Sequence, residues 1–262
     1  MRKSGKTALI TGASAGLGCE FAKLAAQDGH DLVLVARRRD RLEALANELG
    51  AAYGVRATVL TADLGDAAAM RQIAEGVAAA GLHIDILINN AGFGSHGAFA
   101  ELKLGRELEM IDVNVKALVE LTHRFLPSMV ARRQGCILNV ASVAGFVPGP
   151  YMAIYYASKA FVLSFTEALA AELRGTGVTA TAACPGPTAT EFGSVARSDR
   201  TNLFHNRAAA APAVARHGYR AMLAGQVVAI PGLKNKLILQ VLRITPRAVL
   251  RSIVTKLNRN RG

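Results

Sequence analysis

Tyr155 and Lys159 lie four residues apart in a stretch that predicts a helix, so both side chains project from one helical face. An ammonium beside a phenol favours the ionised form and draws the phenol pKa, ordinarily about 10, toward neutral pH. A tyrosine tuned in this way can exchange a proton with a substrate oxygen. The same spacing is common between ordinary surface or core residues, so the pair alone does not establish a site.

A third polar residue, Ser142, comes directly after an apolar run at residues 136–141 that predicts a buried strand. Its hydroxyl can hold the same substrate oxygen by a hydrogen bond and stabilise the charge that develops there. Tyr156 competes for the role of the phenol, but only Tyr155 lies four residues before Lys159. The three residue types together are suited to proton transfer with a substrate oxygen.

A glycine-rich loop follows the first predicted strand and opens a helix. Gly12 would permit a tight turn, Gly16 would let the backbone approach a pyrophosphate, and Gly18 would let the helix pack closely on the strand. Helix N–H groups would then face the anion. An ordinary turn is the alternative for a glycine loop taken alone. The residues expected to bind a dinucleotide here are Gly12, Ser14, Ala15, Gly16, Leu17 and Gly18.

Arg37 and Arg38 follow the second predicted strand, where an NAD-specific protein normally carries an acid that bonds the ribose 2′-hydroxyl. Cations at this position can instead hold a 2′-phosphate through charge-assisted hydrogen bonds, which favours NADP(H). The alternative is that these arginines begin a solvated helix face, because more charged residues follow directly. Arg39 is expected to be a surface residue only.

Two further segments follow predicted strands, at the edge where ligands of open α/β sheets bind. Asp63 and Leu64 come after the third strand and are expected to lie at the adenine. Asn90, Ala91 and Gly92 come after the fourth strand, where small residues and amides can line the cofactor groove.

Seven short apolar runs alternate with helical patterns along the chain. Each run is apolar at nearly every position, which is typical of strands covered on both faces. The pattern predicts an α/β protein with a single Rossmann-type, doubly wound parallel sheet of seven strands flanked by helices. The predicted strands are 7–11, 31–36, 57–61, 84–89, 136–141, 178–183 and 226–230, and the predicted helices are 17–28, 40–49, 67–80, 105–131, 153–174 and 207–223.

The 262 residues, 51% of them hydrophobic, are enough for one α/β domain. We expect residues 1–232 to form a dinucleotide-binding and catalytic domain. Residues 233–262 are expected to add a basic, amphipathic helical extension to the same domain. Its apolar residues Val249, Leu250, Ile253, Val254 and Leu257 fall on one helical face.

The net charge of +12 is confined to the C-terminal quarter. Residues 197–262 hold 13 Lys and Arg residues and one acid, whereas the rest of the chain holds 18 of each sign. The basic residues are interleaved with aliphatic instead of aromatic side chains, which disfavours nucleic-acid binding. The extension either packs its apolar face on its own domain, as amphipathic helices more often do, or lies on an anionic membrane surface.

The expected location is cytoplasmic, with peripheral membrane contact through the extension left open. No apolar stretch approaches the roughly 18 residues that a membrane span requires. Cys19, Cys136 and Cys184 are odd in number and widely separated, so free buried thiols in a reducing compartment are expected. They lack metal-ligand spacing, and no metal site is predicted.

Together these residues resemble the short-chain dehydrogenase/reductase family from Lys6 to about Ile230. The resemblance implies that Tyr155 is the general acid/base, that Lys159 lowers its pKa and bonds the nicotinamide ribose, and that Ser142 orients the carbonyl. It also implies a water held by Asn114 in a proton relay, and a turn over the nicotinamide. The motifs that carry it are TGxxxGxG at 11–18, NNAG at 89–92, Asn114, Ser142, YxxxK at 155–159, and Pro185-Gly186 with Thr188.

The implied activity is NADP(H)-dependent transfer of a hydride between the nicotinamide and a carbonyl or secondary alcohol of a small apolar substrate. A homo-oligomer, dimer or tetramer, is expected, although Pro231-Gly232 stands where many relatives have Asp-Gly-Gly. A dinucleotide-binding regulatory protein without chemistry is the alternative, which the intact catalytic set disfavours. The expected substrate walls are Ser95, His96, Phe146, Val147, Pro148, Tyr151 and a lid at 192–203.

Overall fold

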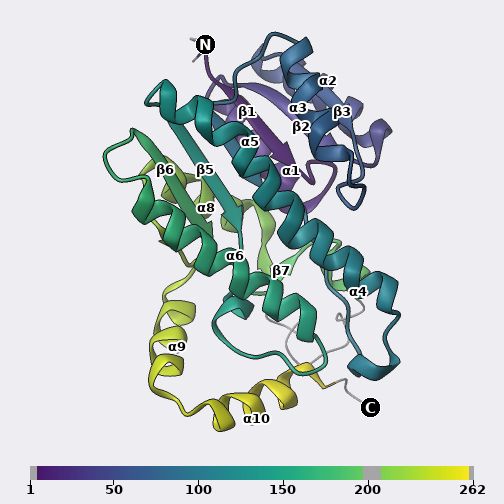
Figure 1. Ribbon diagram of the computed structural model, residues 1–262, viewed down its shortest axis with the longest axis vertical. Coiled ribbons are helices and arrows are strands. Elements are labelled where there is room, and N and C mark those ends of the chain that lie inside the picture. The colour runs from purple at the N-terminus through teal and green to yellow at the C-terminus, as the bar shows by residue number, and fades with distance from the viewer. Residues whose placement is uncertain (1–4, 197–207, 260–262) are drawn as a thin grey trace.

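The computed structural model describes residues 5–196 and 208–259, and its centre is a parallel sheet in the order β3-β2-β1-β4-β5-β6-β9 (Figure 1). The order reverses between β1 and β4, which is where ligands bind in open α/β sheets. The strands are β1 (Thr7–Thr11), β2 (Asp31–Ala36), β3 (Ala57–Thr61), β4 (Ile86–Asn89), β5 (Gly135–Val140), β6 (Val178–Ala183) and β9 (Val228–Ala229).

Helices cover both faces of this sheet. On one face lie α1 (Gly16–Gln27), α2 (Arg39–Tyr53) and α8 (Ala211–Leu223), and on the other lie α3 (Ala69–Ala79), α5 (Ala117–Ala131) and α6 (Ala153–Glu172). The remaining helices are α4 (Leu104–Ile111), α7 (Phe192–Val195), α9 (Leu233–Ile244) and α10 (Arg247–Asn258), with 3-10 turns η1 (Phe99–Glu101) and η3 (Val143–Phe146).

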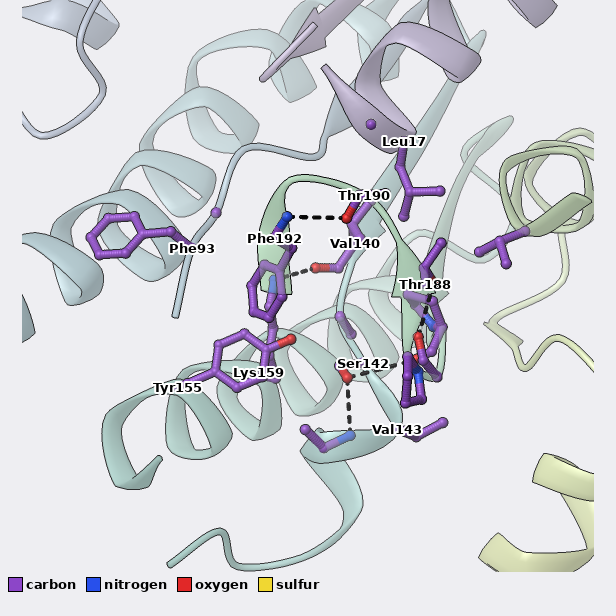
Figure 2. Close-up of a pocket in the computed structure, with 18 of the residues that line it drawn as sticks. Leu17, Phe93, Val140, Ser142, Val143, Tyr155, Lys159, Thr188, Thr190 and Phe192 are labelled. Atoms are coloured by element: carbon purple, nitrogen blue, oxygen red, sulfur yellow. Dashed lines mark hydrogen bonds between the residues drawn. The ribbon is translucent and has the colours of Figure 1, made fainter. Parts of the chain in front are cut away.

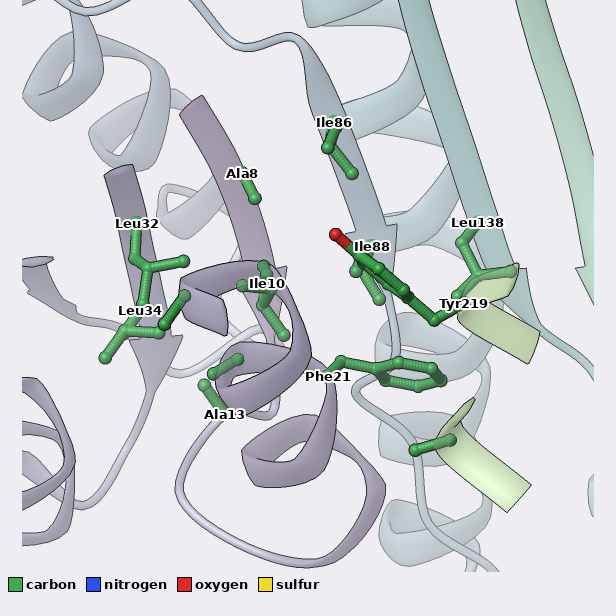
Figure 3. Packing of buried hydrophobic residues seen from close by; sticks show 14 of the residues in the cluster. Ala8, Ile10, Ala13, Phe21, Leu32, Leu34, Ile86, Ile88, Leu138 and Tyr219 are labelled. Atoms are coloured by element: carbon green, nitrogen blue, oxygen red, sulfur yellow. The ribbon is translucent and has the colours of Figure 1, made fainter. Parts of the chain in front are cut away.

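Side-chain alternation along the strands divides the core in two. Ala8 and Ile10 of β1 face the α1 side, where Phe21 and Tyr219 pack against them (Figure 3). Leu9, between them, faces the α5 side. Every residue of β1 is buried, because helices cover both of its faces. The predicted doubly wound sheet is therefore confirmed.

Several details differ from the prediction. The seventh strand shortens to β9, because only Val228 and Ala229 pair with β6. The single helix expected at 105–131 is a helical path that a π-helical turn, η2 (Asp112–Lys116), divides into α4 and α5. A two-stranded sheet of β7 (Thr188–Ala189) and β8 (Ala209–Ala210) was not expected. Its strands are too short to leave a sequence pattern.

The C-terminal extension forms two helices, α9 and α10, which lie at the end of the molecule away from the N-terminus (Figure 1). Pro246, at the start of α10, separates them, because proline lacks the N–H that a continuous helix requires. Leu250 and Val254 of α10 are buried, and Val254 packs with Met152 and Tyr156 of the main body. The apolar face of α10 is thus turned toward its own domain.

Candidate active site

A cavity of about 1140 Å³ is lined by residues that follow strands β1 to β6. The volume exceeds the roughly 300–1,000 Å³ of most small-molecule pockets, so it has room for more than one ligand. Of the residues expected to bind a cofactor or carry chemistry, all except Gly18 and Asn114 line it. The tertiary structure thus brings segments 12–17, 37–38, 63–64, 90–92, 142, 155–159 and 185–188 to one place.

Tyr155 and Lys159 leave α6 on the same side and both line the cavity (Figure 2). The Nζ atom of Lys159 donates a 2.7 Å hydrogen bond to the carbonyl of Val140, at the end of β5. It lies 5.9 Å from the centroid of the Tyr155 ring. The absence of a side chain at Gly92 leaves room for the Asn114 amide, since a Cβ there would lie 3.0 Å from Asn114 Oδ1.

Burial is the main influence on both ionisable groups. It raises the pKa of Tyr155 above its ordinary value, and a hydrogen bond with Ser142 offsets the rise in part. It lowers the pKa of Lys159 to about 8, while the nearby Cys184 acts in the opposite direction. The sequence led us to expect a phenol drawn toward ionisation. The structure instead holds Tyr155 protonated, because desolvation disfavours the charged form.

Ser142 follows the end of β5 by two residues and directly precedes the turn η3. Its Oγ atom accepts a 3.1 Å hydrogen bond from the Ala144 N–H and donates one of 3.3 Å to the Pro185 carbonyl. The Val143 N–H also donates to Pro185. These bonds tie the end of β5 to the loop after β6 and fix the serine hydroxyl at the cavity wall.

Asn114 lies in the π-helical turn η2, a rare geometry that is frequent at functional sites. Its side chain accepts a 3.0 Å hydrogen bond from the Phe93 N–H and donates one of 2.9 Å to the Phe93 carbonyl. It also donates to Ser158 Oγ on α6. Asn114 therefore fastens the loop after β4 to the helix that carries Lys159. Its expected role in a water relay stays a prediction.

Tyr156, the competitor for the phenol role, has its hydroxyl engaged elsewhere. The hydroxyl donates a 3.2 Å hydrogen bond to Asn258 Oδ1 on α10. Tyr155 has its ring 5.1 Å from that of Phe192 and reaches the cavity beside Ser142 (Figure 2). The geometry favours Tyr155 as the phenol that meets a ligand.

The glycine loop fits a phosphate-bearing ligand. Gly12 adopts a φ of 67°, which favours glycine, and a Cβ on Gly18 would lie 2.2 Å from the Gly12 carbonyl oxygen. Both glycines therefore do what their positions predict. The first turn of α1 begins at Gly16 and Leu17, which line the cavity and present helix N-terminal amides on that side. The side chain of Thr190 lies over Gly16, 3.1 Å from an ideal Cβ.

The two arginines after β2 line the cavity but already have partners. Arg37 lies 3.7 Å from an Asp63 oxygen and 3.8 Å from Glu109. Arg38 donates hydrogen bonds of 3.2 and 3.3 Å to Ser14 Oγ, and one of 2.9 Å to Glu191. Both partners of Arg38 are oxygen atoms, so a ligand group rich in oxygen fits beside its guanidinium. Hydrogen bonds from Arg41 and from Arg38 lower the pKa of Glu191.

Comparison with known proteins places the chain in a family. The family model for short chain dehydrogenases matches residues 6–201. The chain belongs to the short-chain dehydrogenase family. The resemblance seen in the motifs is thereby confirmed, although the match does not reach α9 and α10.

Several relatives of this short-chain dehydrogenase are known. Sulfoacetaldehyde reductase 2 of Chromohalobacter salexigens is 40% identical over 186 residues, which cover 70% of this chain and 73% of that protein. A short-chain dehydrogenase from Sphingobium yanoikuyae, solved in complex with NADPH, is 32% identical, with a TM-score of 0.83 over 98% of both chains. A bulky-bulky ketone specific alcohol dehydrogenase from Comamonas testosteroni is 28% identical, with a TM-score of 0.78 over 98% of this chain and 96% of that one. Two further curated relatives are matched over only 62% and 63% of their own length.

The substrate side of this short-chain dehydrogenase differs from the expectation. Val147, Phe192 and Val195 line the cavity, whereas residues 197–203 lie outside the described residues. The other expected wall residues, Ser95, His96, Phe146, Pro148 and Tyr151, are not among the lining residues. The apolar wall comes instead from α9 and α10, through Ile238, Leu239, Leu242, Leu250, Ile253, Val254 and Leu257.

The sequence analysis did not identify three residues that lie at or near the site. Glu191 joins Arg38 and Arg41 across more than 140 residues of chain, and Asn258 joins α10 to Pro150 and Tyr156. His217 lines the cavity with a buried Nε2 atom that has no hydrogen-bond partner among the described residues. No local pattern marks these three, because their partners are distant in the sequence.

Proposed function

We propose that this chain is an NADP(H)-dependent oxidoreductase that interconverts a carbonyl and a secondary alcohol of an apolar substrate, with Tyr155 as general acid/base. The observation that carries the proposal is the meeting of Tyr155, Lys159 and Ser142 with the glycine loop in one cavity. A structural relative solved with NADPH supports the choice of cofactor. The cations at Arg37 and Arg38 support it as well.

In the proposed reduction, the hydroxyl of Tyr155 donates a proton to the substrate oxygen. Ser142 donates a hydrogen bond to the same oxygen and stabilises the negative charge that develops on it. Bound NADPH would supply the hydride. The raised pKa of Tyr155 suits a proton donor, because the phenol remains protonated at neutral pH.

Other residues of the chain would hold the cofactor and the catalytic groups. The phosphates would be held by Gly12, Ser14, Ala15, Gly16 and Leu17, in a loop that Gly18 shapes. Arg37 and Arg38 would hold the 2′-phosphate, and Asp63 and Leu64 would lie at the adenine. Lys159 bonds the nicotinamide ribose, and Asn114 keeps the Lys159 helix in register with the loop after β4. Asn90, Ala91, Gly92, Pro185, Gly186 and Thr188 also line the cavity and would lie beside the nicotinamide.

The substrate is proposed to be apolar because α9 and α10 turn aliphatic side chains into the cavity. The relative that is described as specific for bulky-bulky ketones matches the fold of this chain over nearly its whole length. The test is a panel of ketones and aldehydes of increasing apolar bulk with NADPH, for the wild-type protein and for Tyr155→Phe. Turnover that grows with apolar bulk and vanishes in the variant supports the proposal. NADPH binding without turnover of any panel member favours the regulatory alternative.

We also propose that the exposed face of α9 rests on an anionic membrane surface, while α10 keeps its apolar face on its own domain. Leu237, Val241 and Ile244 of α9 are 61%, 60% and 85% exposed and lie on one helical face. Residues 233–259 hold seven Lys and Arg residues and no acid. A second copy of the chain would bring like charges together, whereas anionic lipid neutralises them. No helix among the described residues is long and apolar enough to cross a membrane.

Co-sedimentation with vesicles tests the membrane contact. The protein is expected to bind vesicles that contain phosphatidylserine and to remain free with neutral phosphatidylcholine. The double variant Val241→Ser with Ile244→Ser should lose this binding while keeping its NADPH affinity. Equal binding of the protein to the two vesicle types would rule the contact out.

The homo-oligomer and the cytoplasmic location remain proposals. Leu104 and Leu108 are exposed on one face of α4, and this face suits a contact between subunits.

A further inference from the structure

The carboxylate of Glu191 lies between two guanidinium groups. Its Oε2 accepts a 2.9 Å hydrogen bond from Arg38, and its Oε1 accepts one of 2.7 Å from Arg41. Arg38 also donates to the hydroxyl of Ser14 in the glycine loop. Two guanidinium groups and a hydroxyl are the donors that a phosphate monoester prefers. An acid of the protein therefore occupies a place built for an anion.

The residue before Glu191 lies in the same groove. The Thr190 side chain covers Gly16, the glycine at which the backbone would approach a pyrophosphate, and comes within 3.1 Å of an ideal Cβ there. Figure 2 shows the hydrogen bond from the Phe192 N–H that holds the Thr190 hydroxyl. Two consecutive residues thus lie along the groove that the proposed function assigns to the cofactor phosphates.

We propose that Glu191 is an internal stand-in for the 2′-phosphate of NADP(H), which must displace it from Arg38 and Arg41 in order to bind. The inference rests on the proposed use of NADP(H). It makes Arg41 a third cation of the 2′-phosphate site, beside Arg37 and Arg38. It also makes Glu191 a specificity-determining residue, because NAD(H) carries no phosphate to compete with the carboxylate.

The exchange favours the phosphate for electrostatic reasons. A phosphate monoester carries a charge of about −1.5 to −2 at pH 7 and three acceptor oxygens, against one charge and two oxygens for a carboxylate. The side chains of Arg38, Arg41 and Glu191 are 39%, 47% and 47% exposed, so each ion pair is weak and easily exchanged.

Displacement of Glu191 would reach the catalytic tyrosine. Glu191 directly precedes α7, and Ser194 Oγ donates to the Glu191 carbonyl, so the residue and the helix form one unit. Phe192, the first residue of α7, lies against Tyr155 with ring centroids 5.1 Å apart. A displacement that moves the Glu191 backbone together with its carboxylate would therefore also shift the Phe192 side chain beside the Tyr155 ring.

The test compares the affinities of NADPH and NADH for wild type and for Glu191→Gln, measured from the nicotinamide fluorescence on titration with protein. The amide removes the negative charge but keeps the size of the side chain. We expect NADPH to bind about fivefold more tightly to the variant, the effect of roughly one exposed ion pair. NADH affinity should stay the same or fall, so the NADPH/NADH preference rises.

A matched control is Glu43→Gln. Glu43 pairs with Arg39 at 2.7 Å on the exposed side of α2, so this change removes the same charge without touching Arg38 or Arg41. Its NADPH/NADH preference should equal that of wild type. Arg41→Gln should have the opposite effect: we expect it to bind NADPH more weakly than wild type and to bind NADH equally well.

The outcomes separate the two proposals. Wild-type protein that binds NADH but no NADPH contradicts the cofactor choice, and the inference about Glu191 with it. Wild-type protein that binds NADPH, with a preference that Glu191→Gln leaves unchanged or lowers, overturns the stand-in alone. A rise of the same size in Glu43→Gln would also overturn it, because the effect would then be one of net charge.

Discussion

The Nζ atom of Lys159 lies 5.9 Å from the centroid of the Tyr155 ring, while its hydrogen bond goes to the carbonyl of Val140. The amine is thus positioned by the sheet and not by the phenol. Burial moves the pKa of the two groups in opposite directions, upward for Tyr155 and down to about 8 for Lys159. The protonation of the Tyr155 phenol and that of the Lys159 amine can therefore be tested separately.

Replacement of the catalytic phenol should reduce turnover by orders of magnitude and preserve the fold. Tyr155→Phe removes only the hydroxyl, and loss of a general acid typically costs about 10²- to 10⁴-fold in rate. NADPH affinity should change little. The control is Tyr156→Phe, which loses a hydrogen bond to Asn258 and about 1 kcal/mol of stability but keeps its turnover. If the Tyr156 variant were the inactive one, the assignment of the two tyrosines would be reversed.

Reduction should slow as the pH rises through about 8. Lys159 carries its charge below its pKa of about 8 and loses it above, whereas Tyr155 remains protonated because burial raises its pKa. The measurement is kcat/KM with NADPH from pH 6 to 10. In Lys159→Arg the charge persists throughout this range, so whatever activity remains should lose the fall near pH 8. A wild-type profile that is flat to pH 10 would contradict the need for the ammonium.

Asn258 should hold the C-terminal helix over the cavity. Its buried side chain donates to the Pro150 carbonyl and accepts from Tyr156, and its own carbonyl lies 2.6 Å from His96 Nε2. Asn258→Ala leaves buried polar groups without partners, which costs about 1–3 kcal/mol in the free energy of unfolding. We expect KM for apolar ketones to rise more than kcat falls.

The control for Asn258 lies on the same helix. The Thr255 hydroxyl donates to the Arg251 carbonyl one turn earlier on the same helix, so Thr255→Ala should leave both KM and the melting temperature nearly unchanged. Chemical denaturation and steady-state kinetics measure both quantities. An unaltered KM in Asn258→Ala would show that α10 does not form part of the substrate wall.

Gly18→Ala should remove dinucleotide binding, because its Cβ would lie 2.2 Å from the Gly12 carbonyl oxygen and 2.6 Å from Asn90 Nδ2. The Gly12 backbone and the Asn90 amide, which donates to the Thr11 carbonyl, cannot move away without opening the glycine loop. Gly105→Ala is the opposite case, since a Cβ at that position in α4 meets nothing within 4 Å. It should stabilise the protein by up to about 1 kcal/mol. NADPH titration and thermal melting distinguish the two variants.

Much of this fold could be read from local pattern. The run Thr7–Thr11 has an apolar centre and is buried at every position because helices cover both of its faces, and the structure gives β1 the predicted bounds. The spacing of Tyr155 and Lys159 on a helix is a local property as well, and it survives in α6. Within one loop, Gly12 is required by its positive φ, and Gly18 is required because the Gly12 carbonyl lies too close for a side chain.

The tertiary structure alone decided the rest, because those contacts join residues whose separation leaves no periodic signal. The sequence places Arg38 beside charged neighbours, but only the fold brings Glu191 between Arg38 and Arg41. It predicts an amphipathic tail, but only packing sets Asn258 against Tyr156 and turns aliphatic side chains into the cavity. The sequence suggests that Lys159 lowers the Tyr155 pKa toward neutral pH. Desolvation, which exists only in the folded core, instead raises that pKa.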